Sequence, residues 1–199
     1  MDSKKIIRGL VLSGVIAGIS WLGAAAQSAS AASGSQDSAS SATSSQSGKL
    51  AASDRQFMMK AAQGSKAEIE LGQLAQQNAS SPEVKQFGQR MVTDHTQASD
   101  QLKQVASQKG VTLPEKLNAK DAATKARLEK LSGQAFDRAY MKDMVMDHKK
   151  DVSEFQNEAK NGKDPDVKNF ASQTAPTLED HLKQAKSIAP KGSSETASK

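Results

Sequence analysis

The sequence has no cysteine, one tryptophan and few aromatic residues, which make up 4% of its 199 residues. The absence of cysteine excludes disulfides, thiolate zinc sites, iron–sulfur clusters and cysteine nucleophiles. The shortage of aromatic residues argues against a β-sandwich or β-barrel, whose strands need Val, Ile, Tyr and Phe in alternation. The chain is rich instead in the helix formers Ala, Gln, Lys, Glu, Leu and Met. We therefore expect an all-α protein.

The first 26 residues have the pattern of a secretory signal peptide. Lys4, Lys5 and Arg8 precede an apolar stretch that ends in three alanines at 24–26. The stretch is also close to the shortest length that spans a membrane, so an uncleaved anchor is the alternative. We expect an exported protein of the periplasm or cell envelope, which touches a membrane only if the leader is retained.

Composition divides the rest of the chain into three parts. Residues 27–49 are rich in Ser and Ala and should form a flexible linker, residues 50–189 should fold, and residues 190–199 should be a disordered tail. The formal net charge of the whole chain is only +5. With so little excess positive charge and so few aromatic residues, we do not expect nucleic-acid binding.

Apolar residues at helical spacing predict four long helices between 50 and 189. Ser53 and Gln56 resemble a capping box at the start of the first helix. Pro82 should open the second helix, which Gly110 should end. A short helix at 119–131, ended by Gly133, is expected in the connector before the third helix at 134–161. The fourth helix should begin at Pro165, run to about Ile188 and be kinked by Pro176.

A short repeat suggests how these helices pair. PEVKQF at 82–87 recurs as PDVKNF at 165–170, and each copy opens the second helix of a pair. Two similar helical hairpins predict a four-helix bundle about 40 Å long. Helices two and three could be antiparallel, or they could be joined by a crossover that runs the length of the bundle.

Four polar residues, one per predicted helix, interrupt the apolar stripes: Glu68, His95, His148 and His181. Glu68 and His95 lie 14 and 13 residues from Pro82, while His148 and His181 lie 17 and 16 residues from Pro165. At 1.5 Å per residue these distances agree to about one helical turn. The four side chains should therefore meet in the middle of the bundle.

Three imidazoles and a carboxylate in a water-poor core are the ingredients of a metal site. Imidazole suits Zn and Cu, and we expect these before Fe. Each histidine follows an aspartate (Asp94, Asp147 and Asp180), which could accept a hydrogen bond from a histidine of a neighbouring helix. Asp151 and Glu179 are further candidates for this supporting role. The alternative is a metal-free network of buried polar groups that fixes the register of the helices.

The methionines and the one tyrosine are better explained as core residues. Met58, Met59, Met91, Met141, Met144 and Met146 occur at helical spacing, which favours core packing over copper ligation. Tyr140 should also be a core residue, although its hydroxyl would lie near the polar layer.

Several segments resemble a known family: EIELGQLA at 68–75, VKQFGQRMVTDH at 84–95, FDRAYMKDMVMDH at 136–148 and TLEDHL at 177–182. They are similar to exported bacterial proteins of the domain-of-unknown-function 4142 family, often labelled outer membrane proteins. The resemblance covers about residues 54–188. It implies a ferritin-like four-helix bundle at the cell envelope and no settled activity. The Glu-x-x-His motif of di-iron bundles is absent, since Val92, Val145 and Leu178 stand three residues before the histidines.

These observations leave two main hypotheses for function. The first is a metal-binding module that serves metal handling or stress tolerance in the cell envelope. The second is a structural or interaction protein that binds no metal and acts through a protein partner or a second copy of itself. An enzyme is the weakest hypothesis, because no Ser-His-Asp or phosphate-loop pattern is present.

Overall fold

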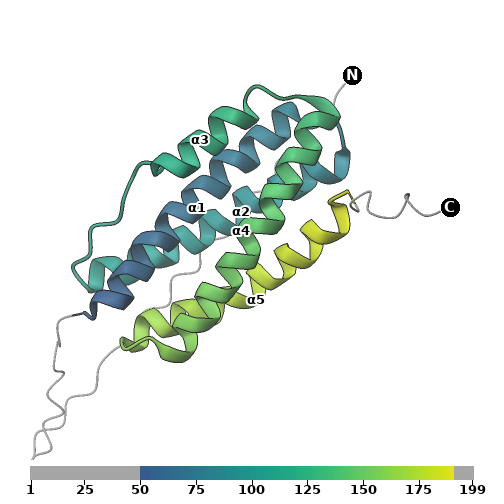
Figure 1. Ribbon diagram of the computed structural model, residues 1–199. Coiled ribbons are helices and arrows are strands. Elements are labelled where there is room, and N and C mark those ends of the chain that lie inside the picture. The colour runs from purple at the N-terminus through teal and green to yellow at the C-terminus, as the bar shows by residue number, and fades with distance from the viewer. Residues whose placement is uncertain (1–49, 191–199) are drawn as a thin grey trace, which may run out of the picture. The chain divides into compact units, whose positions relative to one another are not determined.

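The computed structural model describes residues 50–190, which contain α-helices and no β-strand (Figure 1). This confirms the all-α prediction. The helices are α1 (Ala52–Asn78), α2 (Pro82–Gln108), α3 (Ala119–Leu128), α4 (Gly133–Asn161) and α5 (Pro165–Ile188). The predicted leader, the linker and almost all of the tail lie outside the described residues. No helix within residues 50–190 has both the length and the apolar character needed to cross a membrane.

Local sequence sets most helix boundaries where we predicted them. Pro82 and Pro165 open α2 and α5, and the preceding Ser81 and Asp164 cap them by accepting hydrogen bonds from backbone N–H groups of the first turn. Gly110 follows α2 with a φ of 62°, a left-handed conformation that favours glycine.

Two boundary predictions were wrong. Helix α1 begins at Ala52 without a side-chain cap, because the N-cap position is held by Ala51 and Ser53 lies inside the helix. The Ser53 hydroxyl donates to the Asp54 carboxylate at 2.9 Å. Helix α3 ends at Leu128 rather than at residue 131. Gly133, with a φ of 58°, is the first residue of α4 and does not terminate α3.

The four long helices form two hairpins that pack on each other. Helix α1 packs along α2 and α4 along α5, and the hairpins meet through contacts of α2 with α5 and of α1 with α4. Helix α3 lies against α1 and α4 (Figure 1). Each long helix has 24 to 29 residues, so the bundle is roughly 40 Å long at 1.5 Å per residue.

Contacts at the two ends of the bundle show that the connector between α2 and α4 crosses its full length. At one end, the Asp54 carboxylate accepts hydrogen bonds from the backbone N–H groups of Lys163 and Asp164, in the turn between α4 and α5. At the other end, the Asn78 amide donates to the Leu131 carbonyl just before α4. The start of α4 is therefore at the end opposite to the last turn of α2, and the crossover alternative is correct.

The core is divided into two apolar clusters. One contains Phe57, Met58, Leu102, Phe155, Phe170 and their neighbours, and the other contains Phe87, Met91, Phe136, Tyr140, Met144 and theirs. Each histidine lies between a residue of one cluster and a residue of the other on its own helix. The polar layer therefore separates the two clusters.

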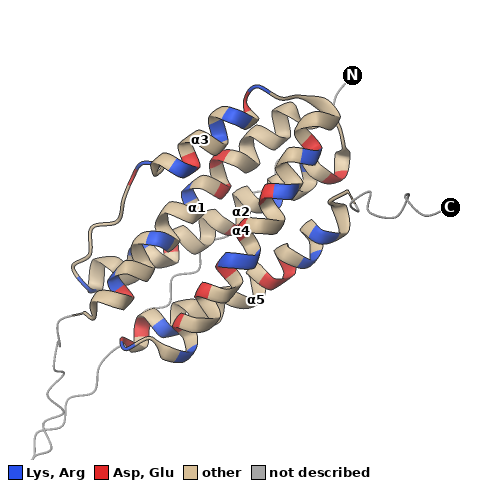
Figure 2. Ribbon diagram, viewed as in Figure 1, with Lys and Arg blue, Asp and Glu red and all other residues tan. Residues whose placement is uncertain are grey.

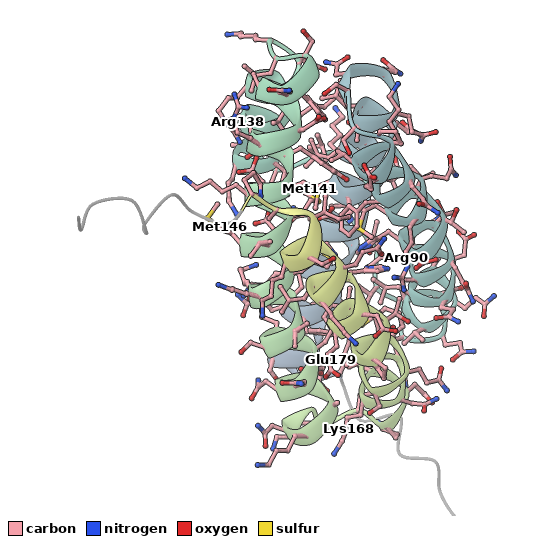
Figure 3. The ribbon with its side chains drawn as sticks, turned by 90° about the vertical axis from the view of Figure 1, so that its right-hand side faces the viewer. Arg90, Arg138, Met141, Met146, Lys168 and Glu179 are labelled. Atoms are coloured by element: carbon pink, nitrogen blue, oxygen red, sulfur yellow. The ribbon has the colours of Figure 1, made fainter. Side chains whose placement is uncertain are left out.

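Charged residues and exposed methionine lie outside this core. Lys, Arg, Asp and Glu are dispersed over the bundle without a one-sided patch in the views drawn (Figure 2). Met58, Met91, Met141 and Met144 are buried, as predicted, and Met59 is partly buried. Met146 is 52% exposed and points away from the bundle (Figure 3), so its assignment to the core was wrong.

Helices α1 and α2 approach closely where two glycines face each other. A Cβ on Gly72 would lie 2.5 Å from the Gly88 carbonyl oxygen, and a Cβ on Gly88 would lie 2.7 Å from the Ala75 Cβ. Both glycines are buried. Neither position has space for a side chain at the present helix separation.

We predict that Gly88→Ala destabilises the fold by about 1–3 kcal/mol, because the methyl group must push the two backbones apart. Gly64→Ala is the matched control, since its Cβ would meet only the Asp151 Oδ2, at 3.9 Å. The control should stabilise the helix by about 0.5–1 kcal/mol. Urea unfolding of both variants measures these changes, and equal effects would contradict the proposed close contact.

Candidate metal centre

The four residues of the predicted polar layer are all buried in the bundle. Glu68 is 3% exposed, His95 is 5% exposed, and His148 and His181 are 0% exposed. They come from α1, α2, α4 and α5 in that order. Counting residues from the helix ends therefore identified buried positions on all four helices.

The three histidines form one compact cluster. Their ring centroids are 5.3 Å apart for His148 and His181, 5.5 Å for His95 and His181, and 5.8 Å for His95 and His148. Each ring offers a nitrogen, and the three nitrogens lie within 4.8 Å of one another. An ion with metal–nitrogen bonds of about 2.0–2.1 Å holds its donors roughly 3.3–3.6 Å apart, so small ring rotations would close the site.

Hydrogen bonds hold two of the rings in opposite tautomers. The His148 Nδ1 lies 2.9 Å from the Met144 carbonyl oxygen, and because a carbonyl only accepts, Nδ1 carries the proton. The His181 Nε2 lies 2.8 Å from the Asp94 Oδ2, and because a carboxylate only accepts, Nε2 carries the proton there. Each ring therefore keeps its other nitrogen unprotonated.

The remaining ring nitrogens have no protein partner. The His95 Nε2, the His148 Nε2 and the His181 Nδ1 are buried and make no hydrogen bond within the described residues. An unpaired buried polar atom costs about 1–3 kcal/mol. A cation bound between the three rings would satisfy all of these atoms at once, so the residues present fit a metal ion.

All three imidazoles are neutral at neutral pH. Burial lowers the pKa of His95 well below its ordinary value, and the neighbouring His148 and His181 lower it further. Burial and His181 lower the pKa of His148 to about 4. Burial also lowers the pKa of His181, against the opposing effect of the Asp94 hydrogen bond. Neutral imidazole is the form that binds a metal.

Glu68 is placed in the same core but is not part of the cluster of donors. The group of metal-ligand atoms found within residues 50–190 comprises the three histidines without Glu68. Burial raises the pKa of Glu68 well above its ordinary value, and the charges of Asp151 and Asp147 raise it further. One carboxyl oxygen of Glu68 has no hydrogen-bond partner among the described residues.

The three aspartates that precede the histidines have different surroundings. Asp94 on α2 accepts the hydrogen bond from His181 on α5, across helices as predicted for a supporting residue. Asp147 lies 3.3 Å from the Lys120 ammonium group of α3. Asp180 is exposed. The Glu179 carboxylate accepts a hydrogen bond from the Gln156 amide at 2.7 Å, on the exposed side of the helices.

Sequence reasoning missed Arg90, which supports the centre from α2. Its Nε donates to the Asp94 Oδ2 at 3.1 Å and one of its terminal nitrogens donates to the Gln184 Oε1 of α5 at 2.9 Å. Figure 3 shows Arg90 between these two helices. Arg90 and Asp94 are four residues apart, a spacing that signals an ion pair on one helix, but nothing in the sequence indicates Gln184 as the third member.

Tyr140 is a core residue, as predicted. It is 0% exposed and its ring stacks on Phe136 with centroids 5.5 Å apart. Its hydroxyl has no hydrogen-bond partner among the described residues. Burial and the charge of Glu68 raise the pKa of Tyr140 well above its ordinary value. The phenol is therefore neutral at physiological pH.

Comparison with known families identifies the family of this chain. A family model described as a domain of unknown function, DUF4142, matches residues 39–188, which is most of the sequence. The chain belongs to the DUF4142 family. This confirms the resemblance that the segments around Glu68, His95, His148 and His181 had indicated. No curated protein matches the sequence of this DUF4142 chain.

Solved structures share the fold of this DUF4142 protein at low sequence identity. A DUF305 fragment from Deinococcus radiodurans has a TM-score of 0.62 at 15% identity, covering 70% of this chain and 96% of that one. A DUF305 protein from Streptomyces coelicolor, described as secreted, has a TM-score of 0.60 at 11% identity with the same coverage. CopM in its Cu(I)-bound form has a TM-score of 0.56 at 21% identity, covering 67% and 93%. At these identities the likeness establishes the helical-bundle fold.

We predict that long-range proton–nitrogen NMR spectra of the metal-free protein show His148 as the Nδ1–H tautomer and His181 as the Nε2–H tautomer. The His148 ring should stay neutral at pH 6, because burial lowers its pKa to about 4. A shared tautomer would contradict the hydrogen bonds to Met144 and Asp94.

The lowered pKa of His148 also has a defined effect on stability. Between about pH 6.5 and 4 the unfolded chain takes up a proton at His148 that the folded protein does not, so the free energy of unfolding falls as the pH falls. Glu68 and Asp151 act in the opposite direction, since the pKa of each is raised in the fold. Comparing the wild type with His148→Gln isolates the histidine contribution.

Proposed function

We propose that this protein binds one transition-metal ion at the three-histidine centre and serves in metal handling at the cell envelope. The observation that carries the proposal is the cluster of three neutral imidazoles, which bring one ring nitrogen each to within 4.8 Å of the others and each have a buried ring nitrogen with no partner among the described residues. The leader pattern in the sequence supports an exported protein. The metal ion would bind these nitrogens, and the surrounding residues would orient the rings and bury the ion.

Copper(I) is the ion that this centre favours. Its three donors carry no negative charge, and the raised pKa of Glu68 favours the neutral carboxyl beside them. The free energy of moving an ion out of water rises with the square of its charge, so a monovalent ion is far easier to bury here than a divalent one. Imidazole suits copper as well as zinc. The Cu(I)-bound CopM with the same fold adds support. Zinc is the second candidate.

Asp94 would support the bound ion through the ring of His181. Its carboxylate is hydrogen-bonded to His181 and also paired with Arg90. A carboxylate behind a ligating histidine fixes the tautomer and makes the ring a better donor. Asp94 therefore holds the His181 Nδ1 available for the metal.

We predict that the protein purified without a histidine tag binds one equivalent of Cu(I), which stabilises it against unfolding. At a free ion concentration 100 times the Kd, the gain is about 2.7 kcal/mol. The double variant His95→Gln/His148→Gln should lose both the bound copper and the gain. Metal analysis and chemical unfolding with and without Cu(I) or Zn(II) make the test.

A protein that binds no metal and unfolds identically in its presence would instead support the structural alternative. In that case the histidine layer would only set the register of the helices, with water at the free nitrogens.

We further predict that Asp94→Asn weakens metal binding by about 10–100-fold, because the ring of His181 loses its charged acceptor. Asp180→Asn is the matched control, since Asp180 also precedes a histidine but is exposed. Competition titrations against a chelator of known affinity measure both. Equal affinities for the two variants would show that the Asp94 hydrogen bond does not act on the metal.

A further inference from the structure

A cavity of about 230 Å³ lies beside the three-histidine centre. His95 and His181 line it, whereas His148 does not. All four long helices contribute to its walls, among them Gly64 of α1, Asp94 of α2, Asp151 of α4 and Thr177 of α5. The centre therefore borders open space on one side.

The other side of the centre is closed by apolar residues. The Phe87 ring lies 6.3 Å from the His148 ring and 6.5 Å from the His181 ring, measured between centroids. Met91 and Met144 come one turn before His95 and His148 and are fully buried. An ion held by the three histidines would thus be shielded from water on this side and accessible from the cavity.

Gly64 keeps the cavity open. It lies in the interior of α1, where glycine is less favourable than alanine by about 0.5–1 kcal/mol. Its position also has space, since a Cβ there would meet only the Asp151 Oδ2, at 3.9 Å. Close helix packing explains Gly72 and Gly88 but not Gly64. The missing side chain leaves volume directly in the cavity wall.

Acidic residues make the cavity suitable for a cation. Asp151 and Glu154 line it together with Asp94. Burial raises the pKa of Asp151 to about 7, so Asp151 carries only part of a negative charge at neutral pH. Two basic residues share the wall: Arg90, whose Nε lies 3.1 Å from the Asp94 Oδ2, and Lys60, whose ammonium group lies 3.5 Å from the Glu154 carboxylate. They offset part of the acidic charge, and three acidic residues against two basic ones leave the wall slightly acidic. Carboxylates along a concave wall raise the local concentration of cations.

We propose that this cavity is the route by which the metal ion exchanges, and that the bound ion has a coordination position facing the cavity where a small incoming ligand can attack. The proposal rests on the proposed function and deepens it: the centre transfers its ion and does not hold it as a sealed structural site. A soft, small donor such as a thiol would bind Cu(I) from the cavity and carry it out.

The test compares Gly64→Leu, which fills the cavity, with Gly64→Ala, which leaves most of it open. Both are loaded anaerobically with Cu(I), and release to an excess of bicinchoninate is followed with increasing 2-mercaptoethanol. We expect the thiol to accelerate release from the wild type and Gly64→Ala in proportion to its concentration. Release from Gly64→Leu should be at least tenfold slower and independent of the thiol, with the Kd for Cu(I) changed by less than threefold.

A second blocking variant, Thr177→Leu on α5, keeps the test valid if Gly64→Leu does not fold. Release from a folded, copper-loaded blocking variant at the wild-type rate, with the thiol dependence intact, would overturn the exchange route alone. A wild-type protein that holds no copper would overturn the proposed function and this inference with it.

Discussion

The structure depends on the burial of three imidazoles between two apolar clusters. Free ring nitrogens in such a place are unfavourable unless something binds them, because a buried polar atom without a hydrogen bond has lost its contact with water and gained nothing in return. The fold nevertheless fixes two of the rings firmly, through the Met144 carbonyl and the Asp94 carboxylate. Both hydrogen bonds leave the second nitrogen of the ring unprotonated and without a partner among the described residues. The protein thus maintains a donor set in advance of any ligand.

That arrangement requires the helices to keep their heights, and polar contacts at both ends of the bundle do this. The Asp54 carboxylate links the start of α1 to the turn between α4 and α5. At the opposite end, the Asp137 carboxylate accepts hydrogen bonds from the backbone of Ser80 and Ser81. A shift of one helix by a single turn would move its histidine by about 5.4 Å, more than the spacing between the donors.

The sequence predicts those features of the centre that follow from the regular geometry of a helix, namely the heights of its residues along the bundle. A fixed rise per residue allowed His95, His148 and His181 to be placed at one height, and their cluster in the structure agrees. Side-chain direction and long-range partners are not fixed in this way, so the position of Glu68 outside the cluster and the contact of Arg90 with Gln184 could not be derived. The cavity could not be derived either, because it depends on how side chains of all four long helices pack around Gly64. The cap expected at Ser53 is absent because the helix already begins at Ala52, before Ser53.

The chemistry of the donors distinguishes this bundle from others of similar shape. A helical bundle is a scaffold for many functions, so the fold shared with DUF305 proteins and CopM does not decide between them. Di-iron bundles place several carboxylates at the core, which balance the charge of two highly charged ions. Here the clustered donors are neutral, and Asp94 is one step removed from them. A centre with three neutral nitrogens and one indirect carboxylate matches a single ion of low charge, and the polar cavity beside it gives that ion a way to leave.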